Sequence, residues 1–597
     1  PFFIEEMVQA LFDEGALTRN GVVKVTRALS QLRLPPTVQG ILAARIDRLS
    51  AEQKDLLQTL AVIGRESPLA LIRKMSAVPE TEVERILAEL RAAEFIYEQP
   101  AATGVEYVFK HALTQEVAYN SLLIERRKLL HEGAEQAIEL MFAGQLNDHL
   151  GQLAHHYSHS DNADKAIEYL GRAGQQAIQR SAHAEAIANL GTAIDLLHSL
   201  PDSPECMRRE LPLQLALGLT LIPVRGWAVA ETERAYTRAL QLCERLGDSP
   251  ELFQALAGLW ALYYLRAQLR PACGVAERLI QLAQNAHNPR LLWTARNLLG
   301  DALFSMGELL RARDQFEQAI SLYGVDDLGR HRQLAHRSAL ADQGVAMLSF
   351  EAAVLWNLGY PAQALKRSNE SLALARALSH PHSVTFAQGF GGRLLVKLQQ
   401  PDAAQEAAES VIAISAEQGF TDQLPSAFGV RGWALAQQGK IEEGITLMEE
   451  SLAASRAQGT ELRRPFFLCL LGEAYVETGR LDEGLSVLAE AEAAAGREEH
   501  EHEPEVHRLK GESLLRRDES NTAEARSCFE RAIEIARNQS AKSWELRATM
   551  SLALAKQGRR EEARRMLAEI YGWFTEGFDT LDLKEAKGLL DELSAAS

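Results

Sequence analysis

The chain has 597 residues, of which 46% are hydrophobic and 24% are charged, and its formal net charge is −18. This composition predicts a folded acidic protein with several cores or one long repetitive core, and it disfavours non-specific binding to nucleic acid. The apolar stretches are much shorter than the roughly 20 residues of a membrane-spanning helix, and the five cysteines form no Cys-x-x-Cys pair, so we expect a cytoplasmic protein that does not enter a membrane.

Residues 1–35 combine one helix with a hairpin signal. Apolar residues recur at helical spacing from Phe3 to Leu11, and Asn20-Gly21 lies between two short β-prone segments. Asn-Gly favours a two-residue hairpin because both residues tolerate a positive φ. Pro35-Pro36 then separates this part from the next one.

Residues 36–112 are predicted to form a winged-helix domain. Amphipathic helices are expected at 37–49, from a Ser50 cap to Ile63, and at 83–93, followed by short strands at 95–97 and 107–109 around a turn at 100–104. Helices followed by such a hairpin are typical of a winged helix.

The charge of this domain argues against reading DNA. Between Thr37 and Lys110, nine Lys or Arg residues face eleven Asp or Glu residues, a net charge of −2. The third helix carries Glu84, Arg85 and Glu89 instead of a set that reads base edges. We therefore expect the domain to act as a lever between its neighbours, with nucleic acid an improbable partner.

Residues 113–146 are predicted to be connecting helices and contain a compact basic cluster. Arg126, Arg127 and Lys128 follow Glu125 directly. The cluster either contacts phosphate or makes an intramolecular contact at the junction with the next domain, and its position between two predicted domains favours the junction.

Residues 147–597 contain repeats. A small residue recurs on helical segments rich in Ala and Leu, at successive intervals of 40, 52, 40, 40, 40, 41 and 38 residues. These anchor positions are Ala272, Ala312, Ala364, Ala404, Gly444, Gly484, Ala525 and Ala563. A small residue stands twelve positions before seven of the eight anchors, and Gly stands five positions before five of them. A unit with Ala154 and Ala166 at the same spacing places the start of the repeats near residue 147.

The pattern predicts about ten antiparallel helix pairs with a period near 40 residues. The two small residues let helix A approach helix B, and the intervening Gly provides a left-handed turn at the end of helix A. The predicted packing residues are Gly300, Gly307, Ala312, Phe316, Ala319, Gly432, Gly439, Gly444, Gly472, Gly479 and Gly484. Segments 201–250 and 324–345 fit the register poorly. The 52-residue interval before Ala364 predicts an insertion, which we place at the charged stretch 326–337 and expect to be an extended loop between repeats. A capping helix is expected at 573–593. The spacing resembles the tetratricopeptide repeat in its longer-helix variant. The predicted fold is therefore mainly α-helical, a winged helix followed by an α-solenoid superhelix.

Two clusters have ligand-like composition, but no metal site is predicted. His155 and His159 are four residues apart on a predicted helix, with His156 and His149 nearby, but neither a cysteine nor a well-spaced carboxylate completes a zinc site. The charged run 498–504 is expected to be a solvated loop. We predict no catalytic residue and no cofactor in this chain.

Three motifs resemble the bacterial signal-transducing ATPases with numerous domains. Residues 1–6, Pro-Phe-Phe-Ile-Glu-Glu, look like the end of their Gly-Asn-Pro-Phe-Phe-Val-Glu-Glu motif, 34–49 match the segment after their ATPase core, and 109–123 match the helix that leaves their winged domain. The resemblance assigns residues 1–35 to the end of the ATPase module. Because the Gly-Asn pair is missing, we expect a carboxy-terminal portion of a longer protein.

The resemblance implies a regulatory and protein-interaction region, with ATP and Mg²⁺ bound in an upstream module. No Gly-x4-Gly-Lys-Ser/Thr loop occurs here, so we expect no enzyme activity in this chain, although the parent would be an NTPase and could carry a nucleotidyl cyclase. The expected partners are a protein or peptide on the concave repeat surface and the ATPase module itself. The alternatives are the regulatory half of a class III adenylate or guanylate cyclase, a free-standing tetratricopeptide adaptor, or part of an ATP-dependent transcription regulator.

Overall fold

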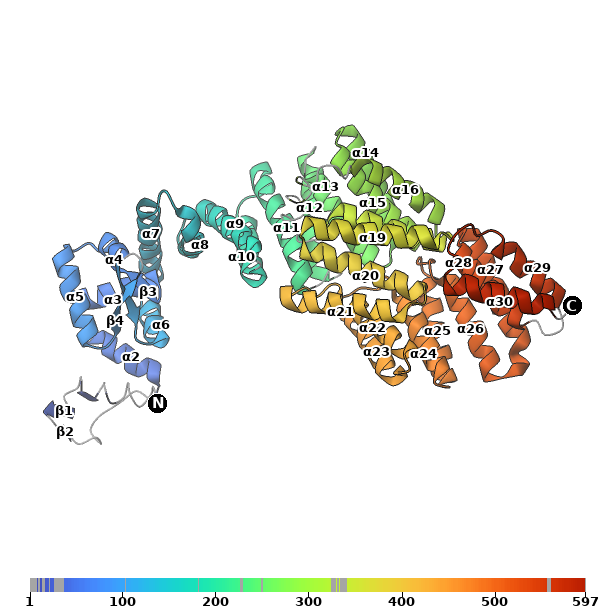
Figure 1. Ribbon diagram of the computed structural model, residues 1–597. Helices are drawn as coiled ribbons and strands as arrows, with labels where there is room; N and C mark the ends of the chain where they lie inside the picture. The colour runs from blue at the N-terminus through green and yellow to red at the C-terminus, as the bar shows by residue number, and fades with distance from the viewer. Residues whose placement is uncertain are drawn as a thin grey trace. The chain divides into compact units, whose positions relative to one another are not determined.

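The computed structural model describes residues 37–101, 104–180, 182–225, 229–247, 251–323, 341–555 and 560–595, with Val8, 11–12, 17–20, 22–25, 329 and 332. The chain forms two compact units, Pro1–Cys206 and Met207–Ser597, and each is described by itself (Figure 1). The predicted class, mainly α-helical with an α-solenoid of repeats, is confirmed. None of the described helices combines the length and the apolar character needed to cross a membrane.

Unit 1 begins with a hairpin and a helical domain that carries a small sheet. Its elements up to the sheet's last strand are β1 (Leu17–Asn20), β2 (Val22–Val25), α2 (Val38–Asp47), α3 (Ala51–Ile63), β3 (Glu66–Pro68), α4 (Leu69–Met75), α5 (Glu80–Ala92), β4 (Ile96–Ala101) and β5 (Gly104–Phe109). The antiparallel sheet has the order β3-β5-β4, and Ile96 pairs with Phe109. The predicted hairpin around Asn20-Gly21 is present, whereas the predicted helix at residues 3–11 lies mostly outside the described residues.

Local sequence explains the helix starts and the core of this domain. Thr37 caps α2 by accepting from the Gly40 amide, and Ser50 and Gln53 form a capping box at α3. Apolar faces of α3, α4 and α5 meet the sheet around the buried Phe109. Sequence reasoning missed α4 and β3, because helices and strands this short leave little periodicity to detect.

The second half of unit 1 consists of connecting helices and the first helix pair. It contains α6 (Ala112–Asn120), α7 (Ile124–Met141), the 3₁₀ turn η2 (Leu146–His149), α8 (Leu150–Tyr157), α9 (Ala163–Gln179) and α10 (His183–Ser199). The boundary between the compact units falls after Cys206, so these helices belong with the N-terminal part although repeats were predicted to begin near residue 147.

Unit 2 consists of helices stacked in antiparallel pairs (Figure 1). They are α11 (Pro204–Arg225, which starts just before the boundary), α12 (Ala230–Leu246), α13 (Leu252–Leu265), α14 (Leu269–Asn285), α15 (Pro289–Ser305), α16 (Leu309–Tyr323), α18 (Gln343–Asn357), α19 (Pro361–Leu378), α20 (Pro381–Lys397), α21 (Pro401–Gln418), α22 (Leu424–Gln437), α23 (Ile441–Ala457), α24 (Arg464–Glu477), α25 (Leu481–Ala495), α26 (Glu503–Arg517), the 3₁₀ turn η3 (Glu519–Asn521), α27 (Thr522–Gln539), α28 (Lys542–Ala555), α29 (Arg560–Tyr571) and α30 (Leu581–Ala595).

The eight anchors lie in the second helix of eight successive pairs, from α13–α14 to α28–α29. Every anchor is buried, as is every residue twelve positions before one. Segment 201–250, which fitted the register poorly, forms α11 and α12, and α30 follows the last pair. The insertion predicted at 326–337 lies outside the described residues apart from 329 and 332.

Candidate functional site

The packing residues predicted for the repeats lie at close contacts between paired helices. A Cβ added at Gly432 would lie 2.7 Å from the Gly444 carbonyl oxygen, and one at Gly300 would lie 2.8 Å from the Phe316 ring. Gly472 similarly faces the Leu488 side chain, and Gly484 faces Val476. Ala312, Phe316 and Ala319 have no exposed surface. The small residues thus permit backbone approach in one pair and make room for a large side chain in others.

The turn position after helix A is left-handed in six of the seven pairs for which the structure describes it. Gly307, Gly359, Gly439 and Gly479 have φ between 77° and 91°. Ala267 and Gln399 occupy the same position with φ of 55° and 57°, although they are not glycine. The repeat geometry therefore imposes this conformation, and glycine adopts it with less strain.

Two connectors of later repeats and the start of α28 lie against the ends of helices in earlier repeats within unit 2. The backbone amides of Glu461 and Leu462 donate to the Leu265 carbonyl oxygen at 2.9 and 3.1 Å, where α13 ends. The His500 amide donates to the Ser305 carbonyl oxygen at 2.9 Å, where α15 ends. The Ser543 hydroxyl donates to the Trp356 carbonyl oxygen at 2.5 Å, near the end of α18. These contacts close the superhelix on itself.

The charged run 498–503, which we call the interior segment, lies inside this closed superhelix. The prediction that it is a solvated loop is wrong: Glu499, Glu501 and His502 are only 2 to 4% exposed. The Glu499 carboxylate accepts from the Arg463 amide at 2.9 Å, and the Gln539 side chain donates to the His500 carbonyl oxygen at 2.7 Å. The carboxylates of Glu499 and Glu501 can be buried here because partners distant in the sequence satisfy them, whereas neither ring nitrogen of His502 has a hydrogen-bond partner.

Glu501 is the centre of a buried polar network. Lys397 Nζ lies 2.5 Å from its carboxylate, and Asn357 Nδ2 donates to the same oxygen at 3.1 Å. Arg463 donates to the Tyr264 hydroxyl at 2.9 Å and lies 3.8 Å from Asp301. These partners come from α13, α15, α18, α20 and the start of α24, so the network joins early repeats to later ones.

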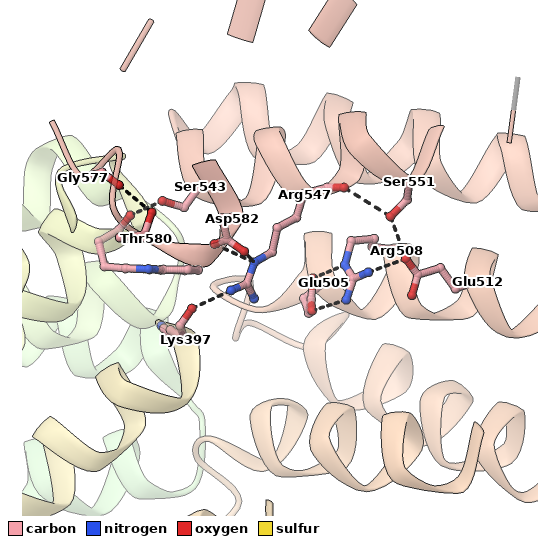
Figure 2. A network of polar contacts seen from close by, with 11 residues as sticks. Lys397, Glu505, Arg508, Glu512, Ser543, Arg547, Ser551, Gly577, Thr580 and Asp582 are labelled. Carbon is pink, nitrogen blue, oxygen red and sulfur yellow. Dashed lines mark hydrogen bonds and ion pairs between the residues drawn. The ribbon is translucent and has the colours of Figure 1, made fainter. Parts of the chain in front are cut away.

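A second part of the network lies beside α28, as Figure 2 shows. Arg547 lies 3.0 Å from the Asp582 carboxylate and donates to the Lys397 carbonyl oxygen at 2.5 Å. Arg508 pairs with Glu505 at 2.7 Å and with Glu512 at 2.6 Å. Buried ion pairs of this kind contribute little net stability, because the cost of removing the charges from water offsets their attraction. Their hydrogen bonds form only when the helices are arranged as they are here, so the pairs favour this way of closing the superhelix.

Desolvation changes the protonation of several interior groups. Burial raises the pKa of Glu499 to about 8 and that of Asp301 to about 7, although Arg463 favours the charged form of both. Desolvation also lowers the pKa of the His502 ring to about 4. The interior therefore contains carboxyl groups that are largely protonated below neutral pH and a histidine that stays neutral.

The interior has little free space. Two cavities of about 20 and 30 Å³ are both lined by Lys397, Phe466 and His502. Each can hold one or two water molecules and is too small for a peptide. A larger hollow of about 640 Å³ lies along α19, lined by Leu365, Lys366, Asn369 and Thr580 among others. The interior segment and its polar partners thus fill most of the space between these repeats.

The three basic residues predicted at the domain junction make contacts within unit 1. Arg126 lies 3.0 Å from Asp55 of α3, and Lys128 lies 2.8 Å from Asp161, between α8 and α9. Arg127 donates to the Tyr119 and Leu122 carbonyl oxygens at 3.2 and 3.4 Å, and its guanidinium lies 4.2 Å from the Tyr119 ring. Arg127 therefore caps the end of α6, while its neighbours bridge α7 to the helices on either side.

The cations of α5 are bound to carboxylates. Arg85 pairs with Glu82 and Glu89 of its own helix, and Arg91 pairs with Glu98 at 2.6 Å. Arg45 of α2 is buried and donates to the Ala93 carbonyl oxygen at 2.9 Å. These pairs reduce the positive charge that this surface could offer to phosphate.

Sequence reasoning missed the interior residues. Arg393 and Lys397 are four residues apart on α20, which is otherwise apolar around them. Charges on one face of an apolar helix were a usable signal, because they need buried partners. His131 was also missed. It lies on α7, and in the described part of the chain it forms with His155 and His156 the one group placed to hold a metal.

Comparison with known proteins identifies part of the repeat region. Tetratricopeptide repeat models match residues 294–325, 465–490 and 544–569. These segments coincide with the pairs α15–α16, α24–α25 and α28–α29. Unit 2 therefore contains tetratricopeptide repeats, a structure that typically binds protein partners.

Individual relatives are distant. An uncharacterized protein of Rhizobium meliloti (strain 1021) is 24% identical over 392 residues, which are 64% of this chain and 36% of that protein. The APC/C hetero-tetramer Cut9-Hcn1 is similar with a TM-score of 0.42 and 11% identity, covering 98% of both chains. A signal transduction ATPase with numerous domains and a tetratricopeptide repeat sensor, from Pyrococcus horikoshii, gives a TM-score of 0.32 and 12% identity, covering 71% of this chain and 66% of that one. The present chain thus spans about a third of the Rhizobium protein.

Proposed function

We propose that this chain is the regulatory and protein-interaction region of a bacterial signalling ATPase, in which the repeats sense a partner and unit 1 relays the change to an ATP-binding module outside this chain. The observation that carries the proposal is the closed superhelix with its interior segment. Such an arrangement can exist in a closed and an opened form, as a sensor requires.

The order of elements in unit 1 supports a relay. The domain has a helix, a strand, two helices and a hairpin in this order, with β5 between β3 and β4. This order supports the proposal that the domain is a winged helix. In a DNA reader the helix at the place of α5 enters the major groove, but here Arg85 and Arg91 are bound to carboxylates. We propose that the domain transmits movement instead, through α6 and α7.

The repeats are proposed to respond by opening. A protein or peptide that competes for the interior must displace Glu499, Glu501 and His502 from their partners. Coupling follows only if the partner binds the opened form more tightly than the closed form. The proposal assigns no catalytic step or nucleotide site to this chain.

The test uses the full-length product of the gene and measures its steady-state ATPase activity. Lys397→Met leaves Glu501 buried without its cation and should loosen the closed form, while Lys366→Met, at an exposed lysine of α19, is the matched control. We expect Lys397→Met to change the ATPase rate severalfold and Lys366→Met to leave it unchanged.

An ATPase rate that stays the same in Lys397→Met, while proteolysis shows a loosened interior, would contradict the relay. Absence of ATPase activity from the full-length wild-type product would favour a free-standing adaptor. Micromolar ATP binding by residues 1–597 alone, measured by calorimetry, would contradict the placement of the nucleotide site elsewhere.

A further inference from the structure

Four histidines gather in unit 1 where α7 meets α8. His131 lies on α7, His155 and His156 lie on α8, and His159 follows that helix. The His131 ring centroid lies 5.6 Å from that of His155, 5.2 Å from His156 and 4.9 Å from His159. The ring centroids of His155 and His159 are themselves 4.6 Å apart, across the C-terminal end of α8.

The ligand atoms of His131, His155 and His156 are close enough for one ion, and the His159 ring lies beside them with its Nδ1 2.8 Å from the His155 carbonyl oxygen. His131 Nδ1 and His156 Nδ1 are 2.9 Å apart, and one nitrogen from each of His131, His155 and His156 lies within 4.8 Å of the others. Zinc–nitrogen bonds of about 2.0–2.1 Å place tetrahedral ligands roughly 3.4 Å apart. Side-chain rotations that move these nitrogens by about 1 Å would therefore bring them to the distances that separate the ligands of a tetrahedral zinc ion.

The surroundings resemble those of ligating histidines. His131 and His156 are both buried among the side chains of unit 1. The Tyr119 hydroxyl lies 3.0 Å from His131 Nε2, on the side away from His156. An outer partner of this kind orients a ligand ring, and the Arg127 guanidinium 4.2 Å from the Tyr119 ring holds that partner in turn.

We propose that His131, His155 and His156, with His159 as the fourth ligand, bind a zinc ion that joins α7 to α8. All four candidate ligands are imidazoles, which suit zinc and not magnesium or calcium, since the latter require oxygen ligands. Bound zinc would hold α7, which follows α6 and the α2–β5 domain, against α8, the first helix of the first helix pair. The site is independent of the function proposed above.

The test is zinc binding by the full chain after removal of metals with EDTA. Zinc is titrated in competition with a chromogenic chelator, and cobalt(II) replaces it to report tetrahedral coordination by visible absorption. We expect one equivalent bound with micromolar or tighter affinity, a higher Tm with zinc, and no response to magnesium.

Variants locate the ion. His155→Ala and His159→Ala change exposed side chains and should not disturb folding, so each should weaken zinc binding tenfold or more. Tyr119→Phe removes the outer partner and should weaken binding about 10-fold to 100-fold. His149→Ala is the matched control, because this histidine stacks on Phe142 outside the cluster and should leave binding unchanged.

Three results would overturn the proposal. They are substoichiometric zinc binding by the wild-type chain, unchanged affinity in the doubly substituted His155→Ala, His159→Ala variant, and loss of binding in His149→Ala equal to that in His155→Ala. His131→Gln adds a test of the buried ligand, and circular dichroism must first show that it is folded.

Discussion

Two glycines of one repeat have different physical roles. Gly432 lies where α22 approaches α23, and a Cβ there would lie 2.7 Å from the Gly444 carbonyl oxygen. Gly439 has φ of 88° and open space around its Cβ position. A side chain at position 432 would collide with the neighbouring helix, whereas a side chain at position 439 would have space but would strain the left-handed backbone.

Alanine and asparagine substitutions separate these roles. Gly432→Ala should destabilise the protein by about 1–3 kcal/mol through overpacking, and Gly439→Ala by about 1 kcal/mol through left-handed strain. Asparagine tolerates the left-handed region, so Gly439→Asn should recover part of the loss while Gly432→Asn should be worse than Ala. Urea denaturation measures the stability of all four variants. A Gly432→Ala variant as stable as wild type would show that the close contact assigned between α22 and α23 at Gly432 is wrong.

The basic residues at the start of α7 also differ from one another. Arg126 makes an exposed ion pair with Asp55, which is worth little, whereas Arg127 caps α6 and stacks on Tyr119. Arg127→Ala should therefore speed proteolysis between residues 110 and 150, and Arg126→Ala should not. Equal cleavage of both variants by limited trypsinolysis, with cleavage sites mapped by mass spectrometry, would contradict this assignment.

At the scale of elements, the sequence predicted the repeats well because their register is local. Small residues at a fixed offset specify one helix–helix contact, and all eight anchors lie in the second helix of a pair. The interior segment could not be found in this way, since Arg463, Gln539 and Lys397 satisfy it from other repeats. A local charge run contains no sign of such partners.

The histidine cluster shows the same limit in unit 1. His155 and His159 were noticed for their spacing, but zinc was rejected because no nearby residue completed a site. His131 is 24 residues before His155 in the sequence, and only the packing of α7 against α8 brings the rings together. The spacing of residues along one helix cannot reveal a ligand that a second helix contributes.

At the scale of the whole molecule, closure of unit 2 should depend on pH. Glu499 has a pKa of about 8 in the folded protein, above its ordinary value. Between the unfolded and folded pKa the native state binds more protons than the unfolded state, so this group's contribution to stability falls as pH rises. Glu503 has a lowered pKa, chiefly through its hydrogen bond with His500, so its contribution has the opposite sign.

Glutamine substitutions test these signs. Relative to wild type, Glu499→Gln should become more stable as pH rises from 5 to about 8.5. The deficit of Glu503→Gln should be constant over that range and should shrink as pH falls below the ordinary glutamate pKa of about 4.3. Differences in Tm from about pH 3 to 8.5 measure both effects. A Glu499→Gln difference that is flat with pH would show that this carboxyl ionises as in water.

The most direct test of the closed superhelix is amide hydrogen exchange of the interior segment in the full chain. The His500 and Glu501 amides donate to the Ser305 carbonyl oxygen at 2.9 and 3.3 Å, inside unit 2. Residues 286–288 form an exposed connector of comparable length whose amides donate to carbonyl oxygens in the last turns of α14, where helices fray. If unit 2 closes as described, residues 499–501 should exchange roughly 100-fold or more slowly than that connector. Exchange of residues 499–501 as fast as that of 286–288 would contradict the closed superhelix.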